Sequence, residues 1–295
     1  AGAHGKQSLT MAMGFGCNAA GVVATRVIDS PRERLIAILT NNFVPCNGRF
    51  PTLIMLATVF VAAGFGGFTS SIIAAGTVVG VVLIGVGFTF LMSWILSRTV
   101  LKGEASAFTL ELPPYRRPNL GRILYTSIID RTIFVLWRAM QTAAPAGAII
   151  WILANVPVGT SNLAAVIAGR LNPFGLLLGL DGVILLSYII AIPANEIVVP
   201  TMMMMYMGAG MMVDGPSTNE AIRSLLVGGH GWTMLTAINL MLFALLHNPC
   251  GTTIITIYKE TKSLKWATLS VVITLGTAFL VTFLTATVAR LLGWV

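Results

Sequence analysis

Residues 189–205 read IIAIPANEIVVPTMMMM, an apolar run that is interrupted at its centre by Pro193, Asn195, Glu196 and Pro200. A proline removes a backbone donor and breaks the hydrogen-bond ladder of a helix. Inside a bilayer, such a break is tolerated only where protein or a polar cavity satisfies the freed carbonyls. The stretch therefore predicts a helix that is broken at membrane depth and whose ends face an interior space.

Glu196 is the one carboxylate that lies deep inside a long apolar run of this chain. An ionisable side chain is costly in a membrane, so by default it marks a functional site. The alternative is a structural role, in which Glu196 is buried and paired with an arginine from another segment. The sequence leaves both readings open.

The composition is that of a polytopic helical membrane protein. Of the 295 residues, 56% are hydrophobic and 9% are charged, whereas a soluble domain carries roughly 25% charged residues. The mean hydropathy is +0.87, and several continuous apolar runs exceed the length of about 18 residues that predicts a membrane helix. The net charge of +8 therefore indicates cytoplasmic loops and anionic headgroups rather than nucleic acid.

Loop charges predict part of the topology. Seven of the 18 basic residues lie between Arg98 and Arg138, which places this segment in the cytoplasm by the positive-inside rule. Residues 121–138 are compatible with an interfacial amphipathic helix. The polar segment 208–229 contains one arginine and two acids and is expected outside. Then 163–180 must cross the membrane; otherwise one of the two loops is on the other side or the broken segments are re-entrant, and the sequence does not decide between these.

The remaining segments have the following expected forms. We expect a helix start at Ser30-Pro31, a short helix over 35–43, two spans over 52–97 with a turn near 64–71, a span over 132–156, a broken span over 182–207, a second broken segment over 230–258 and a final span over 266–294. As domains, these group into a first repeat with its following hairpin (1–97), a basic cytoplasmic or interfacial segment (98–131), a second repeat (132–265) and a C-terminal transmembrane helix (266–295).

Two short motifs occur twice, which indicates an internal repeat. CNAAGVVAT at 17–25 is similar to ANEIVVPT at 194–201, allowing one gap. NNFVPCNGRFPT at 41–52 is similar to LHNPCGTTIIT at 246–256, and both are centred on Pro-Cys. Paired, interrupted helices in corresponding halves are typical of transporters whose site lies at the repeat interface.

Candidate metal ligands gather at these breaks. Thiolate, carboxylate and amide oxygen together suit a borderline divalent metal such as Fe(II), whereas Mg²⁺ and Ca²⁺ prefer oxygen alone. The candidate ligands are Cys17, Cys46, Cys250, Glu196, Asn18 and Asn195, and the candidate gating breaks are at Pro45, Pro193, Pro200 and Pro249. A single cysteine is more often a small buried hydrophobe, but three beside helix-breaking residues favour the metal.

Met202 and His247 are weaker candidate ligands. Met202 opens a run of four methionines, and methionine more often fills irregular cores than binds metal. His247 precedes Cys250 by three residues.

The sequence contains no pattern of an enzyme or of a nucleotide site. GAHGKQS at 2–8 lacks the spacing of a phosphate loop. His4, His230 and His247 lie far apart in the chain, and no Ser/His/Asp or HExxH constellation is present. We therefore expect neither catalysis nor nucleotide binding from this chain itself.

Five stretches together resemble the membrane domain of the bacterial ferrous iron transport protein B family, in matching order and spacing. They are GFGCNAAGVVATR (14–26), PCNGRFP (45–51), ELPPYRRP (111–118), PANEIVVP (193–200) and PCGTTIITIYKETKSLKWA (249–267). The resemblance implies an all-α, polytopic transmembrane bundle with two gate repeats that contain broken or re-entrant helices. The family usually has Cys-Asn-Val-Pro where this chain has Cys17-Asn18-Ala19-Ala20, and Ala-Arg-Leu-Pro where it has Gly48-Arg49-Phe50-Pro51.

The resemblance also implies a function. We expect Fe(II), as transported substrate, to be taken up across the bacterial cytoplasmic (inner) membrane. The family carries an N-terminal GTP-binding domain, so this chain is expected to be a piece of a larger protein, with the small SH3-like Feo A protein as a cytosolic partner and a homo-oligomer as a further possibility. The alternative is a carrier of an organic solute such as a nucleoside. The breaks offer one Glu, two Asn and no tryptophan, which favours the metal.

Overall fold

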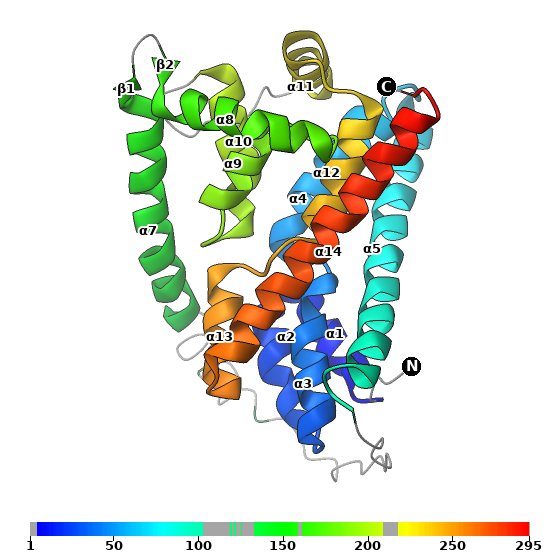
Figure 1. The fold of residues 1–295 in the computed structure, drawn as a ribbon, viewed down its shortest axis with the longest axis vertical. Coiled ribbons are helices and arrows are strands. Elements are labelled where there is room, and N and C mark those ends of the chain that lie inside the picture. The colour runs from blue at the N-terminus through cyan, green and yellow to red at the C-terminus, as the bar shows by residue number, and fades with distance from the viewer. Residues whose placement is uncertain are drawn as a thin grey trace.

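A computed structural model describes residues 5–102, 119, 121, 125, 133–158, 161–208 and 218–294 (Figure 1). Its helices are α1 (Gln7–Gly16), α2 (Asn18–Ala24), α3 (Pro31–Thr40), α4 (Phe50–Leu56), α5 (Gly67–Arg98), α7 (Phe134–Asn155), α8 (Leu163–Leu177), α9 (Gly182–Ile190), α10 (Val198–Met207), α11 (Asn219–Arg223), α12 (Met234–Leu246), α13 (Gly251–Thr261) and α14 (Leu264–Leu291). Two-residue strands β1 (Pro157–Val158) and β2 (Ser161–Asn162) form the one sheet among the described residues. The predicted helical bundle is confirmed.

Four helical stretches are long and apolar enough to cross a membrane. They are Pro31–Val61, Gly67–Arg98, Met234–Thr261 and Leu264–Leu291. The pair α8 and α9, bent by 110°, would add a fifth if it counts as one span. Large apolar side chains such as Leu83 on α5 and Val272 on α14 are each 64% exposed, as expected of helices that face lipid.

The first half of the chain begins with a hairpin of α1 and α2, which pack against each other and are separated by Cys17 alone. Lys6 before α1 forms a 2.7 Å ion pair with Asp29 after α2, so the hairpin enters and leaves at the same end of the molecule. α3 begins at Pro31, and the side chain of Ser30 caps it by accepting the Glu33 N–H.

The broken span continues from α3 through an irregular stretch at 44–46 into α4 and a π-helical turn, Ala57–Val61. After the turn at 62–66, close to the predicted position, α5 runs the whole length of the molecule in the opposite direction (Figure 1). The first half is thus a hairpin, a broken span and a long helix.

The second half repeats this order from the opposite end (Figure 1). α9 and α10 pack against each other, and Tyr206 near the end of α10 donates a hydrogen bond to the carboxylate of Asp181 just before α9. The segment expected to be a broken span over 182–207 is therefore a re-entrant hairpin. α12, a break at 247–250, and α13 form the second broken span, and α14 is the long return helix.

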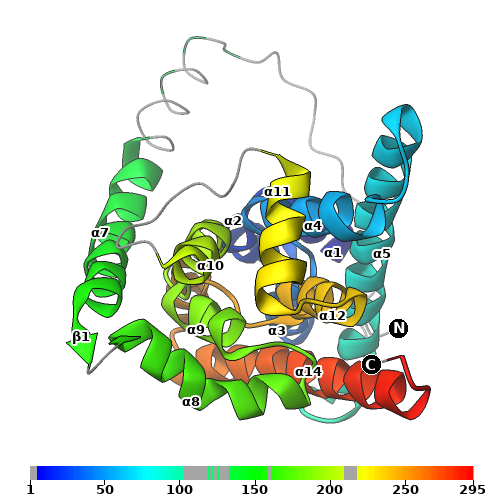
Figure 2. The ribbon, with the colours of Figure 1, turned by 90° about the horizontal axis from the view of Figure 1, so that it is seen from above.

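These two units form an inverted repeat, because their hairpins enter from opposite ends and their broken spans run in opposite directions (Figure 1). α14 is the counterpart of α5, so the second unit extends past the boundary expected at residue 265. α7 and α8 lie outside both units. α7 stands at the periphery (Figure 2). Its residues Ile150 and Ala154 belong to a small apolar cluster with residues of α8, α9 and α10.

Charges distinguish the two ends of the molecule. At the end where α1 begins, Glu260 of α13 binds Arg26 at 2.6 Å and Arg34 at 2.8 Å, and Arg98 ends α5 on the same side (Figure 1). This basic end fits the cytoplasmic side.

Of the segment 208–229, α11 and the residues that follow it lie at the opposite end of the molecule (Figure 1). The described part of this segment is not a loop, because α11 continues into a π-helical stretch at Ser224–Gly229. Most of the expected interfacial helix at 121–138, and the ELPPYRRP stretch, lie outside the described residues.

Candidate functional site: the junction of four helix breaks

Four helix breaks meet at the centre of the molecule, and we call their meeting place the junction. They are Cys17 between α1 and α2, residues 44–46 between α3 and α4, residues 191–194 between α9 and α10, and residues 247–250 between α12 and α13. Gly251 donates its N–H to the Ile192 carbonyl at 2.7 Å, and the Asn42 amide donates to the His247 carbonyl at 2.8 Å. A backbone bond thus joins two breaks of the second repeat, and a side-chain bond joins the first repeat to the second.

The residue before each new helix has an extended backbone. Cys17 (φ −155°, ψ 126°) matches Ala194 (φ −152°, ψ 121°), its counterpart in the sequence repeat. Cys46 (φ −84°, ψ 168°) likewise resembles Cys250 (φ −63°, ψ 159°). Corresponding positions thus share a conformation, and three of these four positions carry a thiol.

The two repeated asparagines hold the hairpin tips against the breaks. Asn18 is buried, and its amide is hydrogen-bonded to that of Asn42 at 3.0 Å. Asn195 is also buried and lies 3.4 Å from His247 Nε2. Each asparagine thus contacts the residues just ahead of the Pro-Cys break of its own repeat. Both predicted ligands are within the junction, where their amides are engaged with protein partners.

Arg49 is a buried charged residue of the junction and is 2% exposed. One terminal nitrogen, Nη1, donates to the carbonyls of Asn42 and Leu245, both at 2.8 Å. The other, Nη2, donates to the carbonyls of His247 at 2.9 Å and Asn248 at 3.3 Å, and to Asn42 Oδ1 at 3.3 Å. A residue of the first repeat thus supplies hydrogen-bond donors to the free carbonyls at the broken helix of the second repeat.

The sequence explains why those carbonyls are free. The Leu245 carbonyl would accept from residue 249 in a continuous helix, but Pro249 has no N–H to donate. A buried charge costs several kcal/mol even after relaxation, and a hydrogen bond to a charged group contributes about 1.5–3 kcal/mol. Several such bonds therefore keep the guanidinium buried without a carboxylate partner.

The three thiols differ in access but lie near one another. Cys17 is exposed, Cys46 is buried and Cys250 is half-buried. The Cys250 thiol lies 3.3 Å from the hydroxyl of Thr253. Each of the three cysteines stands at a break that hydrogen bonds of Asn18, Arg49 or Gly251 tie to the junction. The structure therefore brings the predicted thiols into one region.

Glu196 lies at the junction, but its side chain is exposed rather than buried. A Cβ on Gly48 would lie 2.8 Å from Glu196 Oε1, so the carboxylate rests against the backbone of the first repeat. Among the described residues, Glu196 forms no ion pair. Among the described residues, the buried Arg49 is therefore bound by carbonyl and amide oxygens and not by Glu196.

Three of the four predicted break prolines lie at breaks, namely Pro45, Pro193 and Pro249. Pro200 does not, because it is the third residue of α10, where a backbone N–H needs no partner within the helix. Met202 is fully buried in the main hydrophobic core, which supports the packing role. His247 is buried, and both its ring nitrogens have partners, the Ala244 carbonyl at 3.0 Å and Asn195.

Within the described part of the chain, no three His, Cys, Asp or Glu side chains are grouped closely enough to hold a metal ion. The predicted ligand set is therefore gathered at the junction without being assembled into a coordination shell. Its role as a metal path stays a prediction.

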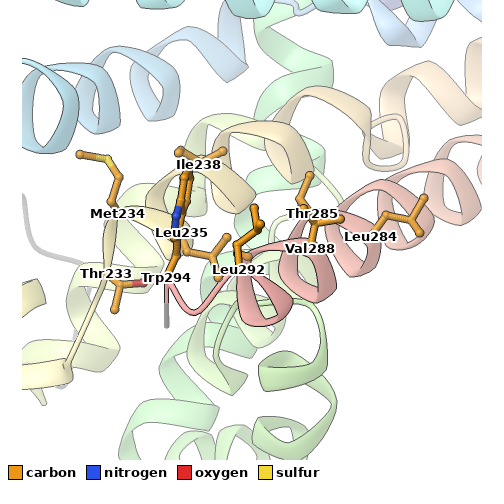
Figure 3. Close-up of a pocket in the computed structure, with 10 residues that line it drawn as sticks. Thr233, Met234, Leu235, Ile238, Leu284, Thr285, Val288, Leu292 and Trp294 are labelled. Carbon is orange, nitrogen blue, oxygen red and sulfur yellow. The ribbon is translucent and has the colours of Figure 1, made fainter.

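The two largest of the described hollows lie outside the junction. An apolar groove of about 660 Å³ lies where α12 begins and α14 ends (Figure 3), with Met234, Ile238 and Val288 among its lining residues. A more polar hollow of about 530 Å³ lies beside the mouth of the second hairpin. Its one carboxylate, Asp181, accepts from the Ile184 N–H at 2.8 Å, from Tyr206 and from Trp232 at 3.3 Å. The donors to Asp181 make it a structural cap.

Arg49, Asn42 and Gly48 are junction residues that the sequence reading did not assign. Arg49 carried a usable signal, because it is a charge that follows a Pro-Cys break within an apolar stretch. Gly48 and Asn42 carried none, since their contacts with Glu196 and His247 join residues far apart in the chain.

The chain matches known families and proteins. The family model described as "Ferrous iron transport protein B C terminus" matches residues 78–130, and the Gate model, described as "Nucleoside recognition", matches residues 136–264. A relative named Fe(2+) transporter FeoB from Staphylococcus aureus (strain MSSA476) is 30% identical over an alignment of 293 residues, and the match covers 96% of this chain and 40% of the relative. No solved structure matches the chain.

Further relatives agree. The Fe(2+) transporter FeoB of Campylobacter jejuni is 26% identical over 99% of this chain and 48% of its own length. A Porphyromonas gingivalis protein named as a fusion of Fe(2+) transport protein A and Fe(2+) transporter FeoB is 27% identical over 96% of this chain and 38% of its own length. The chain spans less than half the length of these relatives. Together, the two family models and the relatives show that the chain belongs to the FeoB family and corresponds to its C-terminal membrane region with the Gate domain.

Proposed function

We propose that this chain conducts ferrous iron across a membrane, and that the ion passes through the junction. The supporting observation is the position of the three thiols, each at the residue where a broken helix resumes and each at a break that hydrogen bonds tie to the junction. Inverted repeats with helices broken at midplane commonly place the transported ion at their interface. Thiolate ligands favour Fe(II) over the more abundant Mg²⁺ and Ca²⁺.

Different residues of the junction would serve different steps in the passage of the ion. Cys46 and Cys250 are shielded and would bind the ion transiently, whereas the exposed Cys17 and Glu196 are accessible for its arrival or release. Asn18 and Asn195 hold the hairpin tips in place through Asn42 and His247. Movement of a hairpin would then change which end of the molecule reaches the thiols.

The organic-solute alternative has less support. A nucleoside site needs aromatic faces on which a base can stack, but the rings of Tyr188 and Phe243 are both packed against His247, with ring centroids 4.6 Å and 5.9 Å away. Neither ring offers a free face toward a solute without rearrangement.

The surroundings of the chain form part of the proposal. We place it in a bacterial cytoplasmic membrane as a multi-pass protein. GTP hydrolysis is assigned to an N-terminal domain in the part of the relatives outside this chain, and the fusion relative supports a link to a protein of the Feo A type. The chain alone should neither bind nor hydrolyse GTP, and adding GTP to it should leave its ion flux unchanged.

The test is Fe(II) uptake into liposomes that contain the purified chain and an internal Fe(II)-chelating dye, under anaerobic, reducing conditions. Uptake should exceed that of empty liposomes, and Mg²⁺ should not compete. Replacing Cys17 and Cys46 together by serine should reduce uptake by about tenfold or more, as loss of metal-site partners does elsewhere. The exposed Met13→Leu variant serves as the control. Uptake that is absent in the parent chain, or unchanged in a folded double variant, would contradict the proposal.

A further inference from the structure

The oxygen atoms around Arg49 form a cage that is suited to a cation. Five acceptors from two stretches of chain, at residue 42 and at residues 245–248, converge on the two terminal nitrogens, and all of them are neutral carbonyl or amide oxygens. Rings of carbonyl oxygens are what selective channels use to replace the hydration shell of an ion. In this conformation, the cage holds the guanidinium of the protein itself.

The cage is contributed by both repeats. Asn42 and Arg49 belong to the first repeat, whereas Leu245, His247 and Asn248 belong to the second. Aligning Pro45-Cys46 with Pro249-Cys250 makes Thr253 the counterpart of Arg49. Thr253 is uncharged and contacts its own Cys250. The positive charge is therefore present in the first repeat and absent from the corresponding position of the second, so a Pro-Cys break does not require it.

The guanidinium and a metal ion at the junction would repel each other, because both are cations. Arg49 donates its backbone N–H to the Cys46 carbonyl at 2.9 Å, and its guanidinium binds the carbonyl of Asn248, two residues before Cys250. Arginine keeps its charge at any physiological pH, and two cations repel more strongly where water is excluded than they do in water. An ion that reaches the thiols of these two cysteines would therefore push the guanidinium out of its cage.

The buried guanidinium is held by hydrogen bonds that can be exchanged. Its Nε finds no acceptor among the described residues, and no described carboxylate pairs with it. Glu196, which is exposed and forms no ion pair with a described residue, rests against Gly48, the residue directly before Arg49. A short movement of this backbone would offer the arginine a charged partner outside the cage.

We propose that the oxygen cage is a cation site occupied in this conformation by the guanidinium of Arg49, which acts as a tethered plug and must withdraw before an ion can pass. The plug rests on the proposed function, because it closes the path assigned to Fe(II). The cage itself does not, since its affinity for a cation can be measured without any transport.

The first test is chemical rescue of Arg49→Ala in the purified chain. Free guanidinium chloride at about 10 mM should bind the emptied cage and raise the unfolding midpoint of this variant by about 3 °C or more, relative to the same concentration of NaCl. The parent chain and Arg223→Ala, which removes an exposed arginine of α11, should show no rise. Equal responses of all three proteins to guanidinium would overturn the cage.

The second test is flux. In liposomes, Arg49→Ala should admit Fe(II) faster than the parent chain, and guanidinium should slow it again. A folded Arg49→Ala variant with parental or lower flux would make Arg49 a structural clamp and sink the plug. A parent chain that carries no Fe(II) would instead refute the proposed function, while the rescue by guanidinium would still report on the cage.

Poor folding of Arg49→Ala does not remove the test. In that case, the yield of monodisperse protein extracted with guanidinium chloride, compared with NaCl, replaces the unfolding midpoint. A gain confined to the variant supports the cage. Equal yields in the two salts count against it, and Arg49→Lys, whose ammonium lacks the planar fork, should gain less than Arg49→Ala.

Discussion

The hydroxyl of Tyr206 donates a hydrogen bond to the carboxylate of Asp181, which ties the last turn of α10 to the residue that caps α9. The ion pair of Lys6 with Asp29 joins the ends of the α1–α2 hairpin in the same way. Each re-entrant hairpin is thus closed at its mouth by a polar contact, which leaves its tip to be positioned by Asn18 or Asn195. The polar contact at the mouth therefore stabilises the hairpin and is separate from the contacts of the junction.

Tyr206→Phe tests this closure. The variant leaves the half-buried Asp181 carboxylate with fewer donors, and a hydrogen bond to a charged group contributes about 1.5–3 kcal/mol. We expect a loss of about 2 kcal/mol in the free energy of unfolding, measured in detergent. Tyr188→Phe is the matched control, because the buried Tyr188 hydroxyl has no partner among the described residues. Equal losses in both variants would contradict the closure.

Gly182→Ala tests the close crossing of α8 and α9. A Cβ at Gly182 would lie 1.9 Å from the Ala168 carbonyl oxygen and 2.8 Å from the Asn172 nitrogen. Since both are backbone atoms, the helices must separate, and we expect a cost of about 3 kcal/mol or a failure to fold. Gly169→Ala is the control, because its Cβ meets nothing within 4 Å. A stable Gly182→Ala variant with parental thermal unfolding would show that the two helices are not packed this closely.

The sequence predicted the helices and the breaks better than their direction. Pro45, Pro193 and Pro249 remove backbone donors locally, so their breaks are readable from the chain. Whether Gly182–Met207 crosses or returns depends on Tyr206 reaching Asp181, 25 residues away, and hydropathy is the same in both cases. The prediction of a helix break at Pro200 was wrong, because a proline in the first turn of a helix costs little.

The sequence predicted which residues gather at the site better than it predicted which of them contact one another. Cys17, Cys46 and Cys250 were found because each adjoins a break, and the breaks meet. The exposure of Glu196 and the burial of Arg49 were not predictable, because they depend on which repeat covers which. Asn42 binds His247 across 205 residues of sequence, and no local pattern encodes such a pairing.

Thiol labelling distinguishes the three cysteines. Cys17 is exposed, Cys250 is half-buried and Cys46 is 9% exposed, so a maleimide added to the folded chain should modify Cys17 first and Cys46 last. If the thiols line an Fe(II) path, Fe(II) added without oxygen should slow labelling of Cys17, whereas Mg²⁺ should not. Peptide mass spectrometry reads each site. Equal labelling rates with and without Fe(II) would make Cys17 a bystander.

Glu196→Gln tests whether this carboxylate serves the ion or the fold. The glutamine keeps the shape and hydrogen-bonding capacity of the side chain but removes its charge. Because Glu196 is exposed and forms no ion pair with a described residue, the free energy of unfolding should stay within about 0.5 kcal/mol. Fe(II) uptake should nevertheless fall, while the exposed Glu220→Gln on α11 should leave both quantities unchanged.

Gly48→Ala makes the same test without touching the charge. Its Cβ would lie 2.8 Å from Glu196 Oε1 and 2.9 Å from the carboxyl carbon, so the carboxylate must move away from the junction. If position matters as well as charge, Gly48→Ala should lower uptake as Glu196→Gln does, and the double variant should be no worse than either single one. Parental uptake in both single variants would remove Glu196 from the path, and a loss of several kcal/mol in Glu196→Gln would restore the ion-pair reading.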